Sequence, residues 1–262
     1  MIHKSVSCTA VLAGWLLWSA ASVQAQTNQL PNLTDTAPAA RFTITDRVWS
    51  TNAGDASICL WEDDKLAALS ITVDDNSAPN INWWMTQADT YGFKMNWFVI
   101  TSLIGGANPT SHGTWPVYSN VLARGHDVQS HSVTHDNTDA EYRDSQIAIE
   151  TNLPGHKCDF LAYPGGSLHP LDPAAAAPYY ASARGTAGAI NTANKITYMN
   201  VYATSSPNLT NAAADWAYLP NLFNSSHAKY RGWSVQIFHW VADYSLYAQP
   251  LLDFYDANRA NL

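Results

Sequence analysis

Two histidines stand four residues apart in the stretch VQSHSVTH, which covers residues 128–135. In a helical turn, this spacing would place the imidazoles of His131 and His135 on one side of the chain. The chain has nine histidines, so a pair at this spacing arises readily by chance. The pair therefore predicts a site only if other polar residues converge on it.

An acidic pair, Asp74-Asp75, follows the apolar run LSITV. Two imidazoles and one carboxylate form a common zinc-ligand set, which leaves a coordination position for water or substrate. The metal would lower the pKa of its bound water to about 7, and the second carboxylate could take the water's proton. Adjacent residues of a regular strand face opposite ways, so both carboxylates can share one site only where the strand has ended.

Two further apolar runs end in groups suited to the same chemistry. His239 follows the run VQIF and is a candidate acid for a leaving group. Pro164-Gly165-Gly166 follows FLAY, and glycine N–H groups, which no side chain obstructs, suit an oxyanion hole. Each motif alone is usually a turn or an ordinary histidine. Together, at successive strand ends, they predict metal-assisted acyl hydrolysis.

These groups must be positioned by alternating strands and helices. The apolar patterns predict strands at 67–73, 94–100, 127–130, 159–163, 185–190, 197–203 and 233–238. They predict helices at 81–91, 116–123, 139–152, within 173–183 and at 246–260. This alternation indicates an α/β fold with a parallel sheet, either a barrel or an open doubly wound sheet. In both, functional residues lie at the carboxyl ends of the strands.

The ends of the chain suggest how it is organised. Residues 1–25 have a basic start, an apolar run and a small-residue ending, which predicts a cleaved signal peptide and a secreted or periplasmic protein. Residues 26–56 form a polar, turn-rich entry segment with one short strand expected at 41–44, and one domain is expected over 57–262. No later run is long and apolar enough to predict a membrane span.

Composition narrows the possible partners. A formal net charge of -8 argues against nucleic acid and anionic membranes, which require clustered Lys and Arg. The 11 Trp and 13 Tyr residues are mostly expected in the core, but some are expected to line a groove for sugar rings, Trp115 foremost. After signal cleavage Cys59 and Cys158 remain, and either a disulfide or two buried thiols fits the sequence.

Four motifs together resemble the polysaccharide deacetylase family with a NodB-homology domain, of the carbohydrate esterase type. They are ITVDDN (71–76), HSVTH (131–135), AYPGG (162–166) and QIFHW (236–240), and the likeness runs from about residue 67 to the C-terminus. The resemblance implies a distorted (β/α)7-type barrel. A chain that stops at Leu262 could leave this barrel incomplete at its C-terminal end, either because the sequence is a fragment or because the barrel is naturally short.

The resemblance also implies roles for individual residues. Asp75, His131 and His135 would bind one divalent metal ion, commonly Zn²⁺. Asp74 would be the general base, His239 the general acid, and the Gly165 N–H an oxyanion donor. The residues expected to contact substrate are Tyr163, Pro164, Trp115 and Arg184.

Ala162 departs from the family, because an arginine that orients the base often stands at this position. Arg184 could supply that charge from another strand, and an ordinary surface arginine is the alternative interpretation. Asn76 also replaces the usual glycine after the acidic pair.

The resulting hypothesis is a secreted, metal-dependent hydrolase that removes N- or O-linked acetyl groups from a polysaccharide or oligosaccharide. Attack by metal-bound water, an Asp base and a His acid would serve either linkage, so the choice between amide and ester stays open. A carbohydrate-binding protein with impaired catalysis on the same fold is the alternative, motivated by Ala162, Asn76 and the early C-terminus. A different metallohydrolase on this scaffold is the third possibility.

Overall fold

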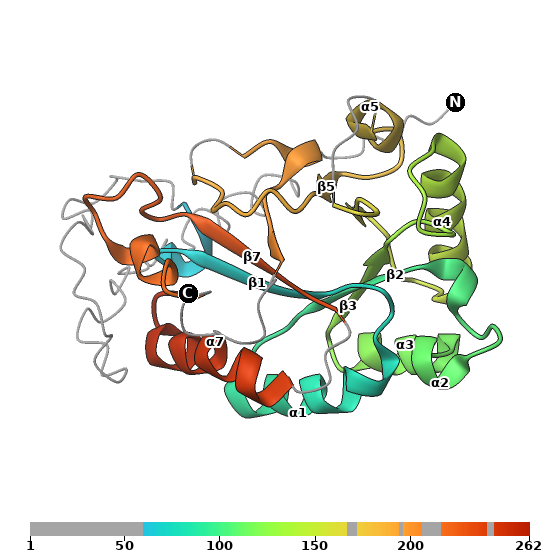
Figure 1. Ribbon diagram of the computed structural model, residues 1–262, viewed down its shortest axis with the longest axis horizontal. Helices are drawn as coiled ribbons and strands as arrows, with labels where there is room; N and C mark the ends of the chain where they lie inside the picture. Colours follow the sequence, from blue (N-terminus) through green and yellow to red (C-terminus); the bar gives the residue numbers. More distant parts are fainter. Residues whose placement is uncertain (1–59, 167–171, 194–195, 206–215, 240–243) are drawn as a thin grey trace, which may run out of the picture. The chain divides into compact units, whose positions relative to one another are not determined.

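The computed structural model describes residues 60–166, 172–193, 196–205, 216–239 and 244–262 (Figure 1). All of them belong to one compact unit that begins at Pro38. The expected signal peptide at 1–25 and entry segment at 26–56, with its strand, lie outside the described residues, as does Cys59. These predictions therefore stay predictions.

The centre of this unit is a seven-stranded sheet in which every strand pair is parallel, in the order β5-β4-β3-β2-β1-β7-β6. The strands are β1 (Ala68–Val73), β2 (Asn96–Val99), β3 (Asp127–Ser130), β4 (Phe160–Ala162), β5 (Ser182–Arg184), β6 (Thr204–Ser205) and β7 (Trp233–Phe238). Val201, just before β6, forms a parallel bridge with Arg184 of β5, so the two edges of the curled sheet meet there. The predicted distorted (β/α) barrel is confirmed.

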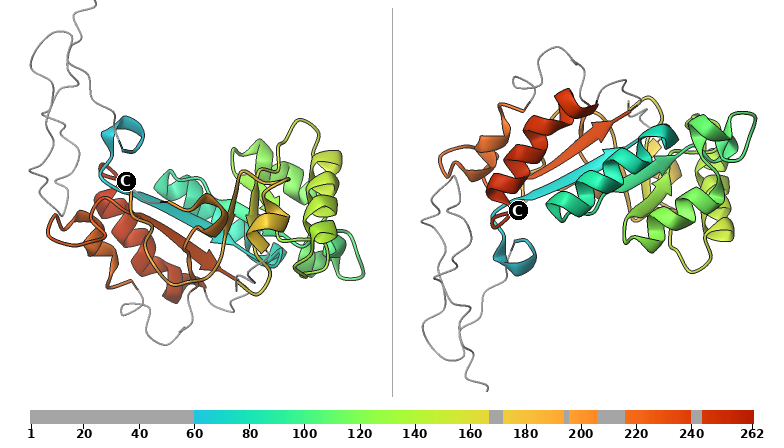
Figure 2. Two further views of the ribbon diagram at one scale, coloured as in Figure 1. Left: turned by 90° about the horizontal axis from the view of Figure 1, so that it is seen from above. Right: turned by 90° about the horizontal axis from the view of Figure 1, so that it is seen from below.

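Helices cover the outside of this sheet. They are α1 (Ile81–Tyr91), α2 (Pro109–His112), α3 (Trp115–Ala123), α4 (Asp139–Asn152), α5 (Asp172–Ala176) and α7 (Tyr244–Asn258). Short 3-10 turns lie at Glu62–Asp64, Ala78–Asn80, Thr101–Leu103, Tyr198–Asn200 and Leu219–Phe223. Helices α1 and α7 lie side by side next to β1 and β7 (Figures 1 and 2), where Gln249 Nε2 donates to the Tyr91 hydroxyl at 2.8 Å.

The strands alternate between two environments, because successive side chains point to opposite faces. Bulky side chains such as Ile71, Val73 and Trp97 point outward into the main core beneath the helices. The alternate positions on β1, Ser70 and Thr72, face the inside of the barrel and are smaller and more polar. The main core therefore lies between sheet and helices, while the barrel interior is less completely filled.

After β4 the predicted helix is present as α5 but is shorter than expected, and the two predicted strands are wrong. The helix expected within 173–183 ends at Ala176, because Pro178 lacks an N–H and disfavours helical geometry in the residue before it. The next strand is β5 at Ser182–Arg184, not 185–190, a segment that contains Gly188 with a φ of 65°. The strand expected at 197–203 is largely a 3-10 turn, and β6 is only the pair Thr204–Ser205.

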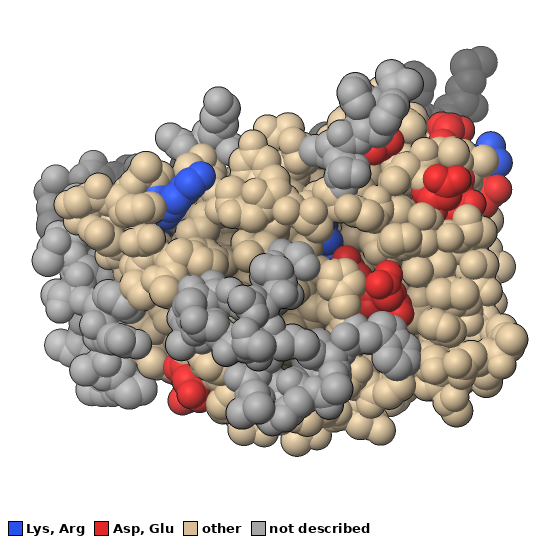
Figure 3. All heavy atoms as spheres, in the orientation of Figure 1, with Lys and Arg blue, Asp and Glu red and all other residues tan. Residues whose placement is uncertain are grey.

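The surface on the face shown in Figure 3 carries few Lys and Arg side chains. Within the described part of the chain, no helix combines the length and apolar character that crossing a bilayer requires. Cys158 is completely buried and is not in a disulfide with any described residue, and burial raises the pKa of its thiol well above the usual value. Both interpretations of Cys59 and Cys158 therefore stay open.

His126 is a buried histidine with no hydrogen-bond partner for either ring nitrogen among the described residues. Its ring packs edge-on against Trp97 at 5.9 Å. Burial, with repulsion from Lys94 and Arg124 and a smaller opposing effect of Asp89, lowers the pKa of His126 to about 4. The unfolded chain, with a histidine pKa of about 6.5, therefore takes up a proton before the folded protein does.

We expect this difference to destabilise the protein as pH falls from about 6.5 to about 4, by up to about 3 kcal/mol. His126→Phe keeps a ring against Trp97 but cannot titrate, so its free energy of unfolding should fall less over this range. Urea unfolding of both proteins at pH 7 and pH 4.5 measures the difference. An equal acid-induced loss in both proteins would contradict this account of His126.

Candidate active site

The register of the sheet brings the first two candidate residues together. Val73 of β1 pairs with Phe238 of β7, so Asp74 and His239 each follow the end of adjacent strands. The Asp74 N–H donates to the Phe238 carbonyl at 2.8 Å and extends this pairing by one residue. His239 Nε2 lies 4.0 Å from Asp74 Oδ2 as a result.

The chain leaves the strand immediately after β1. Asp75, Asn76 and Ser77 have φ values of 55°, 66° and 31°, a left-handed run that is uncommon for residues other than glycine. Asn76 is fully buried and stabilises the turn, because its Oδ1 accepts from the Ile100 N–H at 2.9 Å. The turn brings both carboxylates to one site, which a continued strand could not do. Asparagine tolerates this conformation, so it replaces the family's glycine here.

Asp75, His131 and His135 form a cluster with the geometry of metal ligands. Asp75 Oδ1 lies 3.5 Å from His131 Nε2 and 3.8 Å from His135 Nε2, and one ligand atom from each residue lies within 4.8 Å of the others. Tetrahedral zinc with bonds of about 2.0–2.1 Å has ligand atoms about 3.3 Å apart. The cluster therefore fits a zinc-sized cation after small side-chain shifts.

The carbonyl of Ala162 fixes the orientation of one imidazole. His131 Nδ1 lies 2.8 Å from that oxygen, which can only accept a hydrogen bond, so the proton belongs on Nδ1. The lone pair of Nε2 is then directed at Asp75, where a metal would sit. This backbone contact to the second nitrogen is typical of histidine ligands in metalloproteins.

The surroundings of two cluster residues, Asp75 and His135, favour the protonation states that a metal requires. Burial acts to raise the pKa of Asp75, but hydrogen bonding and charge from His131, with charge from His239 and His135, leave it below its usual value. Burial and the neighbouring His131 lower the pKa of His135, with Asp75 opposing. An ionised carboxylate and neutral imidazoles are the ligand forms that bind zinc.

Asp74 is buried in an ion pair with Arg184. The two side chains are 2% and 5% exposed, and Arg184 Nη2 contacts Asp74 Oδ1 and donates to Thr72 Oγ1 at 3.2 Å. The Arg184 guanidinium also lies over the Phe98 ring, 4.5 Å from its centroid. Arg184 is thus not a surface arginine, and it lies behind the candidate base, out of the groove where a substrate contact was expected.

Sheet register explains why an arginine on β5 can do this. Arg184 is the direct pairing partner of Ala162 on β4, and paired residues of parallel strands project to the same face. The cation therefore projects to the same face as the Ala162 side chain, from the neighbouring strand.

A hollow of about 470 Å³ opens over these groups and contains Asp74, Asp75, His131, His135, Tyr163, Gly165, Gly166, Thr186, Gly188 and His239. A second hollow of about 360 Å³ shares Asp75 and His135 and extends to Leu103, His112 and Thr134. We call the two hollows together the rim groove. Thr186, Gly188, Leu103 and His112 were not identified from sequence, because they belong to no motif and reach the groove through loop folding.

The glycine turn lies at the edge of the rim groove. Gly165 is exposed with a φ of 67°, and its N–H donates to no backbone carbonyl of the described residues, whereas Gly166 N–H donates to the Tyr163 carbonyl. Gly166 has a φ of 66°, a conformation that side chains disfavour, and a Cβ there would also overlap the Thr186 side chain, so glycine is favoured at this position. Asn137, on the loop after His135, links this loop to the glycine turn, because its Nδ2 donates to the Pro164 carbonyl at 3.0 Å.

Tyr163 and Trp115 were also expected to contact substrate, but their side chains do not point into the rim groove as free groups. Tyr163 is 1% exposed and its hydroxyl donates to the Met199 carbonyl at 3.0 Å, so the hydroxyl is not available to a substrate. Trp115 begins α3 and packs against the main core, and it lines neither hollow of the rim groove. Trp115 was expected at a sugar subsite because it lies in a predicted loop. A loop position does not determine the direction in which a side chain points.

Glu141 on α4 supports the loop that carries His135. Its Oε2 accepts from the N–H groups of Val133 and Thr134 at 2.8 and 2.6 Å, and its Oε1 accepts from Thr134 Oγ1 at 2.8 Å. His135, the next residue, has a φ of 70°. The carboxylate therefore holds a strained turn in place, and the turn positions the imidazole.

We expect Glu141→Gln to weaken zinc binding by about 10- to 100-fold, as loss of outer-shell support does elsewhere. An amide replaces one acceptor oxygen by a donor and cannot accept all three hydrogen bonds. Competition titration with a chromophoric chelator measures the zinc Kd. Asp144→Asn, an exposed change on the same helix, is the control and should bind zinc as the wild type does. An unchanged Kd in Glu141→Gln would contradict the supporting role.

The fold and this cluster define a class of protein: a parallel barrel with an Asp-His-His cluster, able to hold a metal ion, at its carboxyl rim. The family described as "Polysaccharide deacetylase" matches residues 62–177, a span that includes Asp75, His131, His135 and Gly165. Over these residues the chain matches the polysaccharide deacetylase family, which confirms the resemblance that its motifs indicated.

A relative from Bacillus sp, named gellan lyase, is 38% identical over an alignment that covers 83% of this chain. That alignment covers 9% of the relative, so this chain spans less than a tenth of its length.

Solved structures of several deacetylases are also similar. A polysaccharide deacetylase from Bacillus cereus matches with 19% identity and a TM-score of 0.46, over 52% of this chain and 46% of that one. A Streptococcus pyogenes deacetylase in complex with acetate has 21% identity and a TM-score of 0.47, over 52% and 62%. A carbohydrate esterase domain of a multidomain xylanase, from the hindgut metagenome of Trinervitermes trinervoides, has 16% identity and a TM-score of 0.46, over 73% and 82%.

Proposed function

We propose that this chain is a secreted or periplasmic, metal-dependent hydrolase that removes acetyl groups from a polysaccharide. One observation carries the proposal: the buried Asp74, paired with Arg184, lies beside both the Asp75-His131-His135 cluster and His239. A base, a metal-binding cluster and a candidate acid therefore border one hollow. This is the set of groups that hydrolysis of an acyl group requires.

The residues would divide the reaction as follows. Asp75, His131 and His135 would hold a divalent cation, with zinc best suited to the N and O ligands, and it would supply Lewis acidity toward water and the acetyl carbonyl. Asp74 would remove a proton from the attacking water, and Arg184 would hold Asp74 in position. The exposed Gly165 N–H would donate to the developing oxyanion. His239 would return a proton to the departing sugar amine or hydroxyl.

A polymeric substrate fits the shape of the site. The rim groove continues on both sides of Asp75 and His135, so a sugar chain could pass across the cluster rather than end there. Because a relative is named gellan lyase, gellan belongs in the panel of polysaccharides to be tested. The alternative, a carbohydrate-binding protein with impaired catalysis, was motivated in part by the absence of an arginine at Ala162. That argument is weakened, because Arg184 supplies a cation to Asp74.

The test is acetate release from acetylated gellan, xylan, chitin oligomers and peptidoglycan fragments. We expect release from at least one of them, loss of release after chelation, and recovery on adding Zn²⁺. Binding to one of these glycans with bound zinc and no acetate release would favour the impaired protein instead. For the location, the protein secreted by an expressing bacterium should begin near residue 26, and retention of residues 1–25 would contradict the signal peptide.

His239→Ala should distinguish the two linkages. An amine leaves only when protonated, whereas an alkoxide needs less assistance, so the variant should lose about 10²-fold in kcat on an N-acetyl substrate and much less on an O-acetyl one. Parallel assays on the same oligosaccharide carrying either linkage measure the ratio. His227→Ala, at a described histidine outside the rim groove, is the control. Equal losses on both linkages would contradict the role of His239 as a general acid.

A further inference from the structure

A separate cavity of about 220 Å³ lies inside the barrel below the rim groove. Its wall includes Ser70 and Thr72, which precede Asp74 on β1, and Trp233 and Val235, which precede His239 on β7. None of its lining residues lines the rim groove. The cavity is therefore a distinct space toward the amino-terminal ends of the strands.

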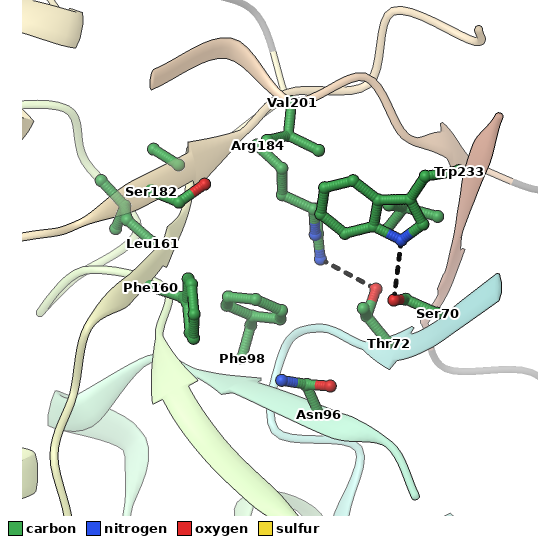
Figure 4. A pocket seen from close by; sticks show the side chains of 12 residues that line it. Ser70, Thr72, Asn96, Phe98, Phe160, Leu161, Ser182, Arg184, Val201 and Trp233 are labelled. Carbon is green, nitrogen blue, oxygen red and sulfur yellow. Dashed lines mark hydrogen bonds between the residues drawn. The ribbon is translucent and has the colours of Figure 1, made fainter. Parts of the chain in front are cut away.

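Small side chains at inward-facing positions create this space. Parallel barrels usually fill their interior with bulky branched residues. Here the inward positions at residues 70, 72 and 182 are Ser, Thr and Ser. The aromatic rings of Phe98 and Trp233 form parts of the opposing wall, and the Trp233 Nε1 donates to Ser70 Oγ at 3.0 Å (Figure 4).

Arg184 is the only charged residue among the described residues that line this cavity. Figure 4 shows its side chain extending from β5 into the space between Phe98 and Trp233, with its hydrogen bond to Thr72. Its hydrogen bonds to Asp74 and Thr72 both use Nη2. Its Nε is buried and has no hydrogen-bond partner among the described residues. A guanidinium has five N–H groups, and the two on Nη2 are used by Asp74 and Thr72, so the N–H of Nε is a buried donor without a partner among the described residues.

We propose that this cavity binds a small monocarboxylate through the Nε–H of Arg184. A carboxylate oxygen is a strong acceptor for a guanidinium N–H, and unpaired buried N–H groups are costly, so binding would satisfy a donor that the protein leaves open. Phe98 and Trp233 offer apolar contact to a short alkyl group. The cavity volume suits an ion of acetate size with a few waters. Acetate is the relevant carboxylate if the proposed function is correct, because the reaction would release it.

Sharing of one guanidinium couples the cavity to the candidate base. A carboxylate bound to Arg184 competes with Asp74 for the same positive charge without occupying the rim groove. Acetate should therefore lower kcat, in addition to any competition with substrate at the cluster. This gives the enzyme a second route to inhibition by its own product.

The test observes the Arg184 Nε–H directly by ¹H–¹⁵N NMR of the zinc-loaded protein during titration with sodium acetate. Arg231 is an internal control, because its Nε is also buried without a partner among the described residues but lies outside the cavity. Acetamide, a neutral molecule of the same shape, is the ligand control. We expect a saturable shift at Arg184 with acetate, little at Arg231, and none with acetamide.

Variants separate this cavity from the rim groove. Ser182→Leu and Ser70→Leu each place a larger apolar side chain in the cavity from opposite walls, and should weaken acetate binding at least about tenfold. His131→Ala disables the cluster and should leave the Arg184 shift intact. A missing shift in the wild type, equal shifts with acetamide, or loss of the shift only in His131→Ala would each overturn the proposal. Since binding needs no turnover, these outcomes are independent of whether acetate release is detected.

Discussion

Asp74→Asn is expected to lower kcat for acetate release by about 10²- to 10⁴-fold, the range typical of removing a positioned general base. The amide has nearly the same shape as the carboxylate but cannot accept the proton of the attacking water. Zinc binding should change little, because the cluster uses Asp75 and the two histidines instead. Steady-state kinetics with simultaneous measurement of bound zinc separate loss of the base from loss of the metal.

A nearby carboxylate provides the matched control. Asp136 is exposed on the loop after His135, and Asp136→Asn removes the same charge from the same end of the barrel. This variant should retain most of the activity. A zinc-loaded Asp74→Asn enzyme with wild-type kcat would exclude Asp74 as the base.

Arg184→Met is expected to have the second largest effect, on stability and catalysis together. It leaves the Asp74 carboxylate buried at 2% exposure without its cation. Breaking a buried ion pair by removing one partner typically costs about 3–5 kcal/mol. Freed from its partner, Asp74 should also lose its fixed orientation, which we expect to lower kcat more than it raises KM. Urea unfolding and steady-state kinetics measure the two effects.

A double-mutant cycle tests whether these effects arise from the pair itself. In Arg184→Met combined with Asp74→Asn, neither side chain is a buried charge, so the double variant should be more stable than the sum of the single losses predicts. Arg184→Lys restores a charge without the planar fork and should recover part of the stability. Additive losses in the cycle would show that Asp74 and Arg184 do not depend on each other.

The Asp75-His131-His135 cluster could be predicted from the sequence, because the residues that identify it lie within short segments of the chain. His131 and His135 belong to one turn, and Asp75 directly follows a strongly apolar run. The polarity changes that mark the ends of β1, β3 and β7 also identify which edge of a parallel sheet carries the polar residues. The order of motifs along the chain indicated the family, and the family match confirmed it.

Predictions were weaker where the backbone pattern was ambiguous. The alanine-rich segment before β5 resembles a helix, and the strand itself is only three residues long. Ser182 and Ala183 were therefore included in the segment expected to hold the helix, and the strand was expected only from residue 185. The hydroxyl of Tyr163 and the side chain of Trp115 were expected at the substrate. Their packing against Met199 and the main core depends on contacts that no local pattern encodes.

By itself, the sequence determined the ends of β1, β3 and β7, the Asp-His-His ligand types and the glycine turn, since each depends on residues close together along the chain. Only the tertiary structure decided which arginine accompanies Asp74. Asp74 and Arg184 are 110 residues apart, and they meet because Arg184 pairs in register with Ala162 and projects to the same face of the sheet. The small side chains that face the inside of the barrel, Ser70, Thr72 and Ser182, leave the cavity beneath that pair. Register and side-chain volume across non-adjacent strands are properties of the assembled barrel, which no single segment of the chain contains.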